Sequence, residues 1–393
     1  MKNFYKKIGS LVLLLCTGTL LMAQTLTYKA LSQELQSLQK QLVPDKRVAI
    51  LDIELRDTLQ HKVVVSGETN LPDAKVQIIR FLTDKKISFA VSIRLLPDYS
   101  LGDKTWALSS LSVSNLRAQP DNASELVSQA LMGTPMKVID FRNNWCRIQT
   151  PEHYIGWMEA SQLQRLNPKE MEHWKKSNRY TFNLLSGFAY DAPTLKGNIV
   201  SDLVLGDLFE VEARVHRFLK IRTPDGRIGY VRRKGCLSFG DWSKSEPNIQ
   251  SILSVAKQMM GSPYLWGGIS SKALDCSGLV KLAYYSQGII LARDASQQAK
   301  YGESIDFNNM NNLQPGDLLF FGRSAQRITH VGIYEGKGNF IHASGRVQIS
   351  SIDPGDSKYD PARKNVAIRR ILNSLNTEGI VRVKDHPWYS VQP

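Results

Sequence analysis

The sequence predicts an α+β protein, in which helical and all-β segments follow one another instead of alternating regularly. Leucines at helical spacing mark an N-terminal helix, and a segment of short alternating strands occurs twice between residues 105 and 240. The last third combines helical stripes with two-residue alternation. The hydrophobic fraction of 42% is typical of a globular chain, and 393 residues exceed one core, so we expect several domains.

The N-terminus has the pattern of a secretory signal peptide. Three lysines precede an apolar run over residues 11–22, and Ala23 then leads into polar chain. The run is too short for a membrane-spanning helix, and no later segment is long enough, so no stable membrane insertion is expected. Lipidation at Cys16 is disfavoured because leucines precede it. We therefore expect cleavage of residues 1–23 and export to the periplasm or the extracellular space.

Removal of residues 1–23 takes away three lysines and no acid, so the net charge falls from +14 to +11. This charge favours acidic partners. Nucleic acid is not expected, because the chain has neither a basic run nor interleaved aromatic residues and is exported. Cys146, Cys236 and Cys276 remain, too few for a disulfide scaffold, and an odd number indicates a free thiol. Cys146 and Cys236 form either a disulfide or two separate thiols.

Residues 24–104 read as a small α+β domain. A helix is expected over 26–43, strands over 49–55 and 63–65, a helix over 72–82 that Pro72 opens, and a strand over 87–95. Nothing in this segment assembles a recognisable site, so a structural or spacer role is the expectation.

Residues 105–240 contain an internal repeat. Residues 148–157 match residues 221–230 at a constant offset of 73, including the sequence Thr-Pro followed by an acidic residue. Short alternating segments broken by Gly, Pro and Asn are typical of small all-β barrels, and two copies predict two tandem barrels. Trp157 and Tyr230 end matching strands and are expected to be core residues.

A polar linker at 243–248 precedes a helix that ends at Gly261. Asp275-Cys276-Ser277-Gly278 then stands just before a second helical stripe, which ends at Gly288. Cys276 is therefore expected at a helix N-terminus, where the macrodipole favours the thiolate and lowers the pKa of the thiol. Such a thiolate is a nucleophile if a base lies nearby.

A hairpin supplies the expected base. Residues 330–334 and 339–343 read as two strands around a glycine-rich turn, and residue 336 is the midpoint between His330 and His342. The two imidazoles are therefore expected to face each other directly on one side of the sheet. His330 is predicted to be the base and His342 to orient it. A zinc site is the alternative for these side chains, but the sequence offers no clear fourth ligand, so neither a metal nor another cofactor is expected.

Five segments of the last third resemble the NlpC-type (NlpC/p60) cell-wall cysteine peptidases, which have a papain-like fold. They are Tyr264-Leu-Trp-Gly-Gly268, Asp275-Cys-Ser-Gly278, Pro315-Gly-Asp317, His330-Val-Gly332 and Ile341-His-Ala-Ser344. The resemblance covers about residues 246–372 and implies hydrolysis of peptidoglycan peptides by Cys276, His330 and His342. It also implies that Tyr264 and the Cys276 N–H stabilise the oxyanion.

Each repeat resembles a bacterial SH3-like domain, and the whole arrangement resembles the YkfC-type γ-D-glutamyl-L-diamino acid endopeptidases. In that subfamily the first SH3-like domain closes the cleft and recognises a free N-terminal L-alanine. The resemblance implies that Glu125 pairs with the substrate ammonium and that Tyr154 lies beside it. It further implies substrate binding by four residues of the peptidase part: Trp266, Asp275, Ser277 and Ser296.

The expected domains are residues 24–104, two SH3-like domains at 105–168 and 178–242, a papain-like peptidase at 246–372, and a tail at 373–393. The expected function is cleavage of the γ-D-glutamyl to L-diamino acid bond of peptidoglycan stem peptides, with either meso-diaminopimelate or L-lysine following the bond. Two alternatives remain: an amidase or D,D-bond peptidase acting on intact wall, and a non-catalytic wall-binding protein. The diamino acid and the oligomeric state stay open.

Overall fold

The computed structural model describes residues 28–57, 63–86, 88–306 and 310–391. The predicted signal peptide and Cys16 lie outside these residues. The chain divides into two compact units, residues 1–99 and 100–393, and each is described by itself. Among the described residues, no helix is both long enough and apolar enough to cross a membrane.

The first unit is a three-stranded sheet with helices. Strand β2 pairs antiparallel with β1 and parallel with β3, and α2 makes the crossover between the two parallel strands. Leucines and isoleucines of these elements share one core with the helix over residues 28–42, as their spacing predicts. The bounds are β1 Leu51–Asp57, β2 Val63–Thr69, α2 Pro72–Asp84 and β3 Phe89–Leu95.

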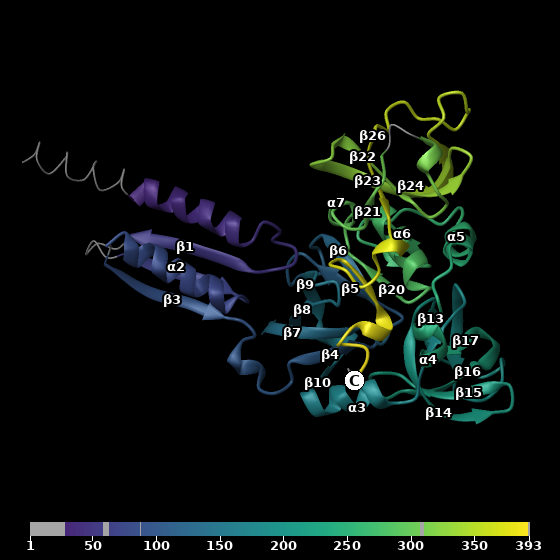
Figure 1. Ribbon diagram of the computed structural model, residues 1–393. Coiled ribbons are helices and arrows are strands. Elements are labelled where there is room, and N and C mark those ends of the chain that lie inside the picture. The colour runs from purple at the N-terminus through teal and green to yellow at the C-terminus, as the bar shows by residue number, and fades with distance from the viewer. Residues whose placement is uncertain (1–27, 58–62, 87, 307–309, 392–393) are drawn as a thin grey trace, which may run out of the picture. The chain divides into compact units, whose positions relative to one another are not determined.

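The second unit begins with the first copy of the repeat, a seven-stranded antiparallel sheet in the order β10-β4-β7-β8-β9-β5-β6, which helix α3 follows (Figure 1). Its bounds are β4 Trp106–Ser109, β5 Val113–Arg117, β6 Leu126–Leu131, β7 Pro135–Arg142, β8 Trp145–Gln149, β9 Ile155–Glu159, β10 Leu163–Leu166 and α3 Pro168–Lys176.

The second copy has the same strand order, written from its other edge as β13-β12-β16-β15-β14-β11-β17, and α4 follows it. Each strand begins 73 residues after its counterpart, so the sequence repeat is a structural repeat. The bounds are β11 Arg179–Phe182, β12 Ser186–Tyr190, β13 Ile199–Val204, β14 Leu208–Val215, β15 Phe218–Arg222, β16 Ile228–Arg232, β17 Cys236–Ser238 and α4 Phe239–Lys244.

The two copies are open sheets, so the predicted barrels do not close. Each sheet has two edge strands that do not pair with each other. In the first copy, the edge strand β6 turns toward the last third of the chain, where Gln129 Oε1 accepts a hydrogen bond from the Ile269 N–H at 3.1 Å. This edge is used for contact with the next part of the chain and not for closure.

The last third packs helix α6 against a six-stranded sheet in the order β21-β26-β22-β23-β24-β25 (Figure 1). Residues 373–391 are not a loose tail over their described length, because β27 pairs with β20. The bounds are α5 Ile249–Gln258, β18 Ile269–Ser270, β19 Ala273–Leu274, α6 Cys276–Tyr285, β20 Ile289–Leu291, α7 Ala295–Gln298, β21 Glu303–Ser304, β22 Leu318–Ser324, β23 Arg327–Gly336, β24 Asn339–Ser344, β25 Arg346–Ser351, β26 Asn365–Arg370 and β27 Ile380–Arg382.

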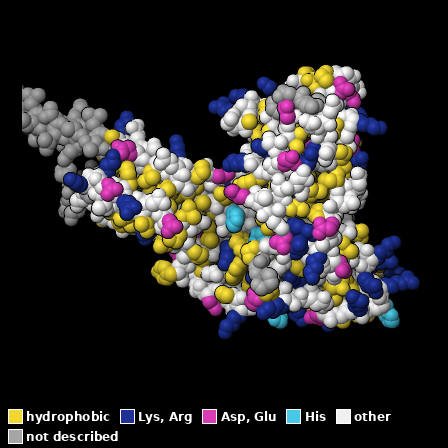
Figure 2. Space-filling view, in the orientation of Figure 1, with side chains coloured by type: hydrophobic (Ala, Val, Ile, Leu, Met, Phe, Trp, Pro, Cys, Tyr) yellow, Lys and Arg dark blue, Asp and Glu magenta, His cyan; other side chains and the backbone are white. Residues whose placement is uncertain are grey.

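The positive charge is unevenly spread over the visible face. Figure 2 shows Lys and Arg side chains gathered over the second copy of the repeat, at the lower right of the view. Exposed cations there come from the β14–β15 turn and from the end of β16, and they include Arg217, Arg233 and Lys234.

Candidate active site

Cys276 is the first residue of α6, as the sequence predicts. Asp275 caps this helix: its Oδ1 accepts from the Gly278 N–H at 2.7 Å and its Oδ2 from the Gly267 N–H at 3.0 Å. A Cβ on Gly278 would lie 2.0 Å from the Gly268 carbonyl oxygen. The glycines therefore allow the start of the helix to pack directly on the backbone of the preceding loop.

The thiol of Cys276 is buried, with 6% of the residue exposed. Burial raises its pKa to about 11, and the Asp275 carboxylate adds to the rise, whereas the N–H groups of Val331 and Ser277 oppose it. The expectation of a lowered pKa is therefore wrong for the free protein. The N–H groups near the sulfur lower the pKa of the thiol, but the loss of solvation raises it by more.

The two histidines meet on the face of the sheet that carries Phe321 and Phe340. His330 Nε2 lies 2.8 Å from His342 Nδ1, and His342 Nε2 lies 2.9 Å from Ser350 Oγ. Burial lowers the pKa of His330 to about 3 and that of His342 to about 4. Both rings are therefore neutral near pH 7, and His330 Nδ1 remains outside this chain of contacts.

The expected direct opposition of the two histidines is wrong. The register shifts between Tyr334 and Gly336, and Ile333 then pairs with Ile341, so Gly332 stands across from His342. A bulge adds a residue to one strand and moves the pairing along. His330 stays on the same face because it is two residues from Gly332, and it reaches His342 diagonally across the space that Gly332 leaves open.

Tyr264 lies beside the thiol, as expected. Its backbone N–H donates to the Gly345 carbonyl at 2.9 Å, which ties this loop to the turn after β24. Burial raises the pKa of its hydroxyl, and the nearby Cys276 and Asp275 raise it further. The hydroxyl is therefore a proton-bearing donor close to the sulfur.

Asp275 and Ser277 are joined by Arg293, whose role the sequence did not reveal. Arg293 Nη2 lies 2.6 Å from Asp275 Oδ2, and Nη1 donates to Ser277 Oγ at 3.0 Å. Its Nε donates to Ser128 Oγ of the first sheet at 2.9 Å. The guanidinium is only 1% exposed, and the Asp275 carboxylate keeps it charged by raising its pKa against the effect of burial.

The first sheet also sends two side chains to this region. Trp266 Nε1 donates to Glu125 Oε1 at 2.7 Å, and the Tyr154 hydroxyl donates to Asp294 Oδ2 at 3.2 Å. Glu125 and Trp266 are exposed, whereas Tyr154 is buried. Glu125 and Tyr154, which are expected to recognise the substrate amine, are thus both hydrogen-bonded to the peptidase part.

Ser296 is half-buried in α7, a short helix that packs against β23. Arg293, Asp294 and Ser350 were missed as site residues. Arg293 and Asp294 could have been found from the sequence, because they stand three and two residues before Ser296, which the resemblance names as a substrate-binding residue. The sequence contains no signal for Ser350, because only the pairing register of β24 and β25 brings it to His342.

The three cysteines that the structure describes are all free, so Cys146 and Cys236 are separate thiols. Burial raises the pKa of Cys146 to about 11 and that of Cys236 to about 12. No group of three or more His, Cys, Asp or Glu side chains within the described ranges is placed to hold a metal ion.

Comparison with known families decides what this region is. The NlpC/P60 family matches residues 261–363, which contain Cys276 and both histidines. Residues 261–363 are an NlpC/P60 domain. The bacterial SH3 domain family matches residues 110–164, the first copy of the repeat.

The chain is also similar to curated proteins of two bacteria. The chain is 28% identical over 261 residues to dipeptidyl-peptidase 6 of Lysinibacillus sphaericus, covering 63% of this chain and 92% of the relative. It is 29% identical over 240 residues to γ-D-glutamyl-L-lysine dipeptidyl-peptidase of Bacillus cereus, covering 56% and 68%. The crystal structure of an NlpC/P60 family protein from Bacillus cereus has the same fold, with a TM-score of 0.59 at 22% identity over 68% of this chain and 99% of that chain.

Proposed function

We propose that the protein is an exported cysteine endopeptidase that cuts the γ-D-glutamyl to L-diamino acid bond of peptidoglycan-derived peptides with a free N-terminal L-alanine. The observation that supports this chemistry is a buried thiol at the start of α6 that receives the N–H of Val331, the residue next to His330, whose ring contacts His342. The names of the two relatives, both dipeptidyl-peptidases, support a cut close to the N-terminus of a short peptide.

In the proposed reaction, Cys276 Sγ attacks the γ-carbonyl carbon while His330 Nδ1 takes the thiol proton. In the tautomers that this step requires, His330 Nε2–H donates to His342 Nδ1, and His342 Nε2–H donates to Ser350 Oγ, over the contacts of 2.8 Å and 2.9 Å. This direction of hydrogen bonding leaves the Nδ1 lone pair of His330 free for the proton. His342 holds the ring in that tautomer, as the third member of a nucleophile–base–orienter set does.

The Tyr264 hydroxyl and the Cys276 N–H stabilise the negative oxygen that forms during the attack. The carbon–nitrogen bond then breaks, and the amine of the diamino acid leaves with the proton held by His330. Water adds to the thioester as His330 takes one of its protons. The carbon–sulfur bond breaks, and the thiol regains a proton.

Recognition of the free amine is assigned to the first sheet. Glu125 carries a carboxylate that Trp266 holds by a hydrogen bond, and this carboxylate would pair with the ammonium of L-alanine. Tyr154 would lie beside it. Asp275, Ser277 and Ser296 would hold the γ-D-glutamyl portion, with Arg293 fixing the first two.

The decisive experiment is digestion of defined peptides followed by mass spectrometry. Wild-type protein is expected to release L-alanyl-γ-D-glutamate from the tripeptide that ends in meso-diaminopimelate or L-lysine. The Cys276→Ala variant should release none, because the nucleophile is gone. Release at the wild-type rate by that variant would refute the mechanism.

Acetylation of the substrate amine tests the recognition step. The acetylated peptide should be cut far more slowly, and Glu125→Gln should lower kcat/KM on the free peptide by about tenfold to a hundredfold through loss of a charge-assisted contact. Glu212→Gln is the matched control, since Glu212 pairs with Lys220 and Arg222 on the second copy. Equal rates on both peptides would instead favour an amidase or D,D-bond peptidase that acts on intact wall.

A wall-binding protein without catalysis remains the second candidate, because the chain carries a bacterial SH3 domain and a second copy of its fold. Such a protein would sediment with intact peptidoglycan and release no peptide from any substrate. Export is tested separately, by fractionation of cells and by mass determination of the mature N-terminus.

A further inference from the structure

The loop over residues 150–154 of the first sheet makes polar contacts with the peptidase part at three residues, and His153 packs edge-on against Trp388. Glu152 Oε1 lies 3.0 Å from Lys281 Nζ, and the Pro151 carbonyl lies 3.1 Å from His386 Nε2. The third polar contact is the bond from Tyr154 to Asp294. The loop that carries Tyr154 is thus fastened directly to the part that carries Cys276.

The Glu152–Lys281 contact differs from the other two because both partners are ionised and buried. Their side chains are 9% and 10% exposed, and Lys281 also donates to the Leu291 carbonyl at 2.7 Å. Burial would raise the pKa of Glu152, but Lys281 and hydrogen bonds outweigh it and hold the pKa below its usual range. Such a pair adds little net stability, yet its separation leaves a buried lone charge, which is costly.

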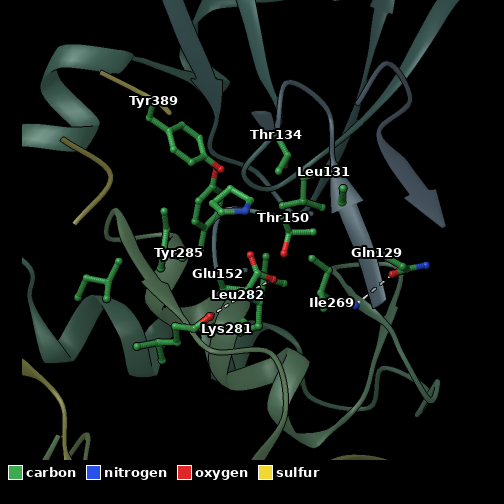
Figure 3. Close-up of a pocket in the computed structure, with 15 residues that line it drawn as sticks. Gln129, Leu131, Thr134, Thr150, Glu152, Ile269, Lys281, Leu282, Tyr285 and Tyr389 are labelled. Carbon is green, nitrogen blue, oxygen red and sulfur yellow. Dashed lines mark hydrogen bonds and ion pairs between the residues drawn. The ribbon is translucent and has the colours of Figure 1, made fainter. Parts of the chain in front are cut away.

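Packing alone does not fix the loop at this point. A cavity of about 40 Å³ lies beside the ion pair, where side chains of the first sheet, α6 and the C-terminal segment would otherwise touch. Figure 3 shows Glu152 and Lys281 pointing toward each other, with Thr134, Thr150, Tyr285 and Tyr389 around the same space. The cavity leaves fewer packing contacts at this point, and the ion pair adds a positional constraint there.

The second copy of the repeat shows what the same turn does without this contact. There Asp225, the counterpart of Glu152, lies 2.7 Å from Arg227 of its own loop. Arg227 is the counterpart of Tyr154. Both copies keep the bond between the acid and the preceding threonine. The first copy thus has Tyr154 in place of this arginine and directs the acid to Lys281.

We propose that Glu152 and Lys281 are a positioning pair that sets the Tyr154 loop and thereby the selectivity for substrates with a free amine. The inference rests on the proposed function. Lys281 belongs to α6, the helix that begins at Cys276, so the pair ties recognition of the amine end to the element that carries the nucleophile. Neither side chain would touch the substrate.

The test compares Glu152→Gln with Asp225→Asn, the same change in the second copy. Glu152→Gln should raise KM for the free tripeptide by about tenfold or more, with kcat within about twofold, because the recognition loop is displaced while the nucleophile is not. Its preference for free over acetylated peptide should shrink. Asp225→Asn should match wild type, and the rate at which iodoacetamide labels Cys276 should stay unchanged in both variants.

A double variant separates position from stability. Glu152→Gln with Lys281→Met removes the lone charge, so the thermal midpoint should recover while KM stays raised. A normal KM in Glu152→Gln, or a KM that recovers together with the midpoint, would overturn the proposal. If wild type cuts neither peptide, the proposed function fails. In that case, hydrogen–deuterium exchange over residues 150–154 tests whether Glu152 and Lys281 position the loop. Faster exchange in Glu152→Gln than in Asp225→Asn would support this role, and equal exchange would refute it.

Discussion

At the residue scale, the proposed nucleophile and the proposed base are both neutral in the free protein. The pKa of Cys276 is raised to about 11 by burial, and that of His330 is lowered to about 3. A preformed thiolate–imidazolium pair would need the opposite shifts. The geometry therefore favours proton transfer during attack over an ion pair that exists before substrate binds.

This predicts the pH dependence of alkylation at Cys276. Because a thiol reacts as thiolate, the iodoacetamide rate should rise steadily between about pH 6 and pH 10, with no plateau near neutrality. The measurement is labelling of the Cys276 peptide, quantified by mass spectrometry so that Cys146 and Cys236 do not interfere. A plateau with a midpoint below about pH 7 would show that an ion pair forms without substrate.

Ser350 ends the hydrogen-bond chain and is predicted to position His342. Ser350→Ala leaves the His342 Nε2–H without its partner, which should favour the wrong tautomer and lower kcat by about threefold to tenfold with little change in KM. Ser350→Thr keeps the hydroxyl and should retain most of kcat. Steady-state kinetics on the tripeptide checks both, and an Ala variant with normal kcat would remove Ser350 from the mechanism.

At the element scale, the β23–β24 hairpin sets the distance between the histidines. Its register follows from the irregularity at Glu335, and its close packing follows from Gly332. A Cβ on Gly332 would lie 2.6 Å from Phe340 Cδ2 and 3.2 Å from His342 Cβ. Phe340 is fully buried, so it has little room to move.

Gly332→Ala is therefore expected to destabilise the fold by about 1–3 kcal/mol and to lower kcat by separating the imidazoles. Urea unfolding and kinetics measure the two effects. Gly240→Ala serves as control, since the nearest atom to its Cβ would be 3.9 Å away. An unchanged kcat in folded Gly332→Ala would mean that the hairpin tolerates a wider spacing than the chemistry requires.

At the scale of the second unit, Arg293 joins the first sheet to the start of α6. It contacts Ser128 on one side and Asp275 and Ser277 on the other, all buried. Buried guanidinium groups with bidentate carboxylate partners specify geometry strongly, because an unpaired partner is costly. Arg293 thus connects the candidate active site to the first sheet.

Arg293→Met should lower the free energy of unfolding by about 3–5 kcal/mol, since Asp275 would stay buried and unpaired. Arg222→Met removes a surface ion pair with Glu212 and should change the free energy of unfolding by less than about 1 kcal/mol. Denaturant titration of the two variants checks the difference. Equal small effects would show that water reaches Asp275 when the arginine is absent.

The sequence alone determined much of the architecture and the central groups of the candidate site. The 73-residue repeat, the helix that begins at Cys276 and the hairpin with His330 and His342 follow from periodicity and capping, which depend on neighbours along the chain. The family resemblance also pointed to Glu125 and Trp266, whose side chains the structure joins.

Only the tertiary structure decided the open edges of the sheets, the diagonal contact of the histidines, the raised pKa of Cys276 and the contacts of Arg293 and Glu152. Each of these depends on groups far apart in the chain. A bulge shifts register without a sequence signal, and the sign of a pKa shift depends on how much solvent the folded chain removes. Burial and long-range pairing arise only when separate segments pack together, so no local pattern encodes them.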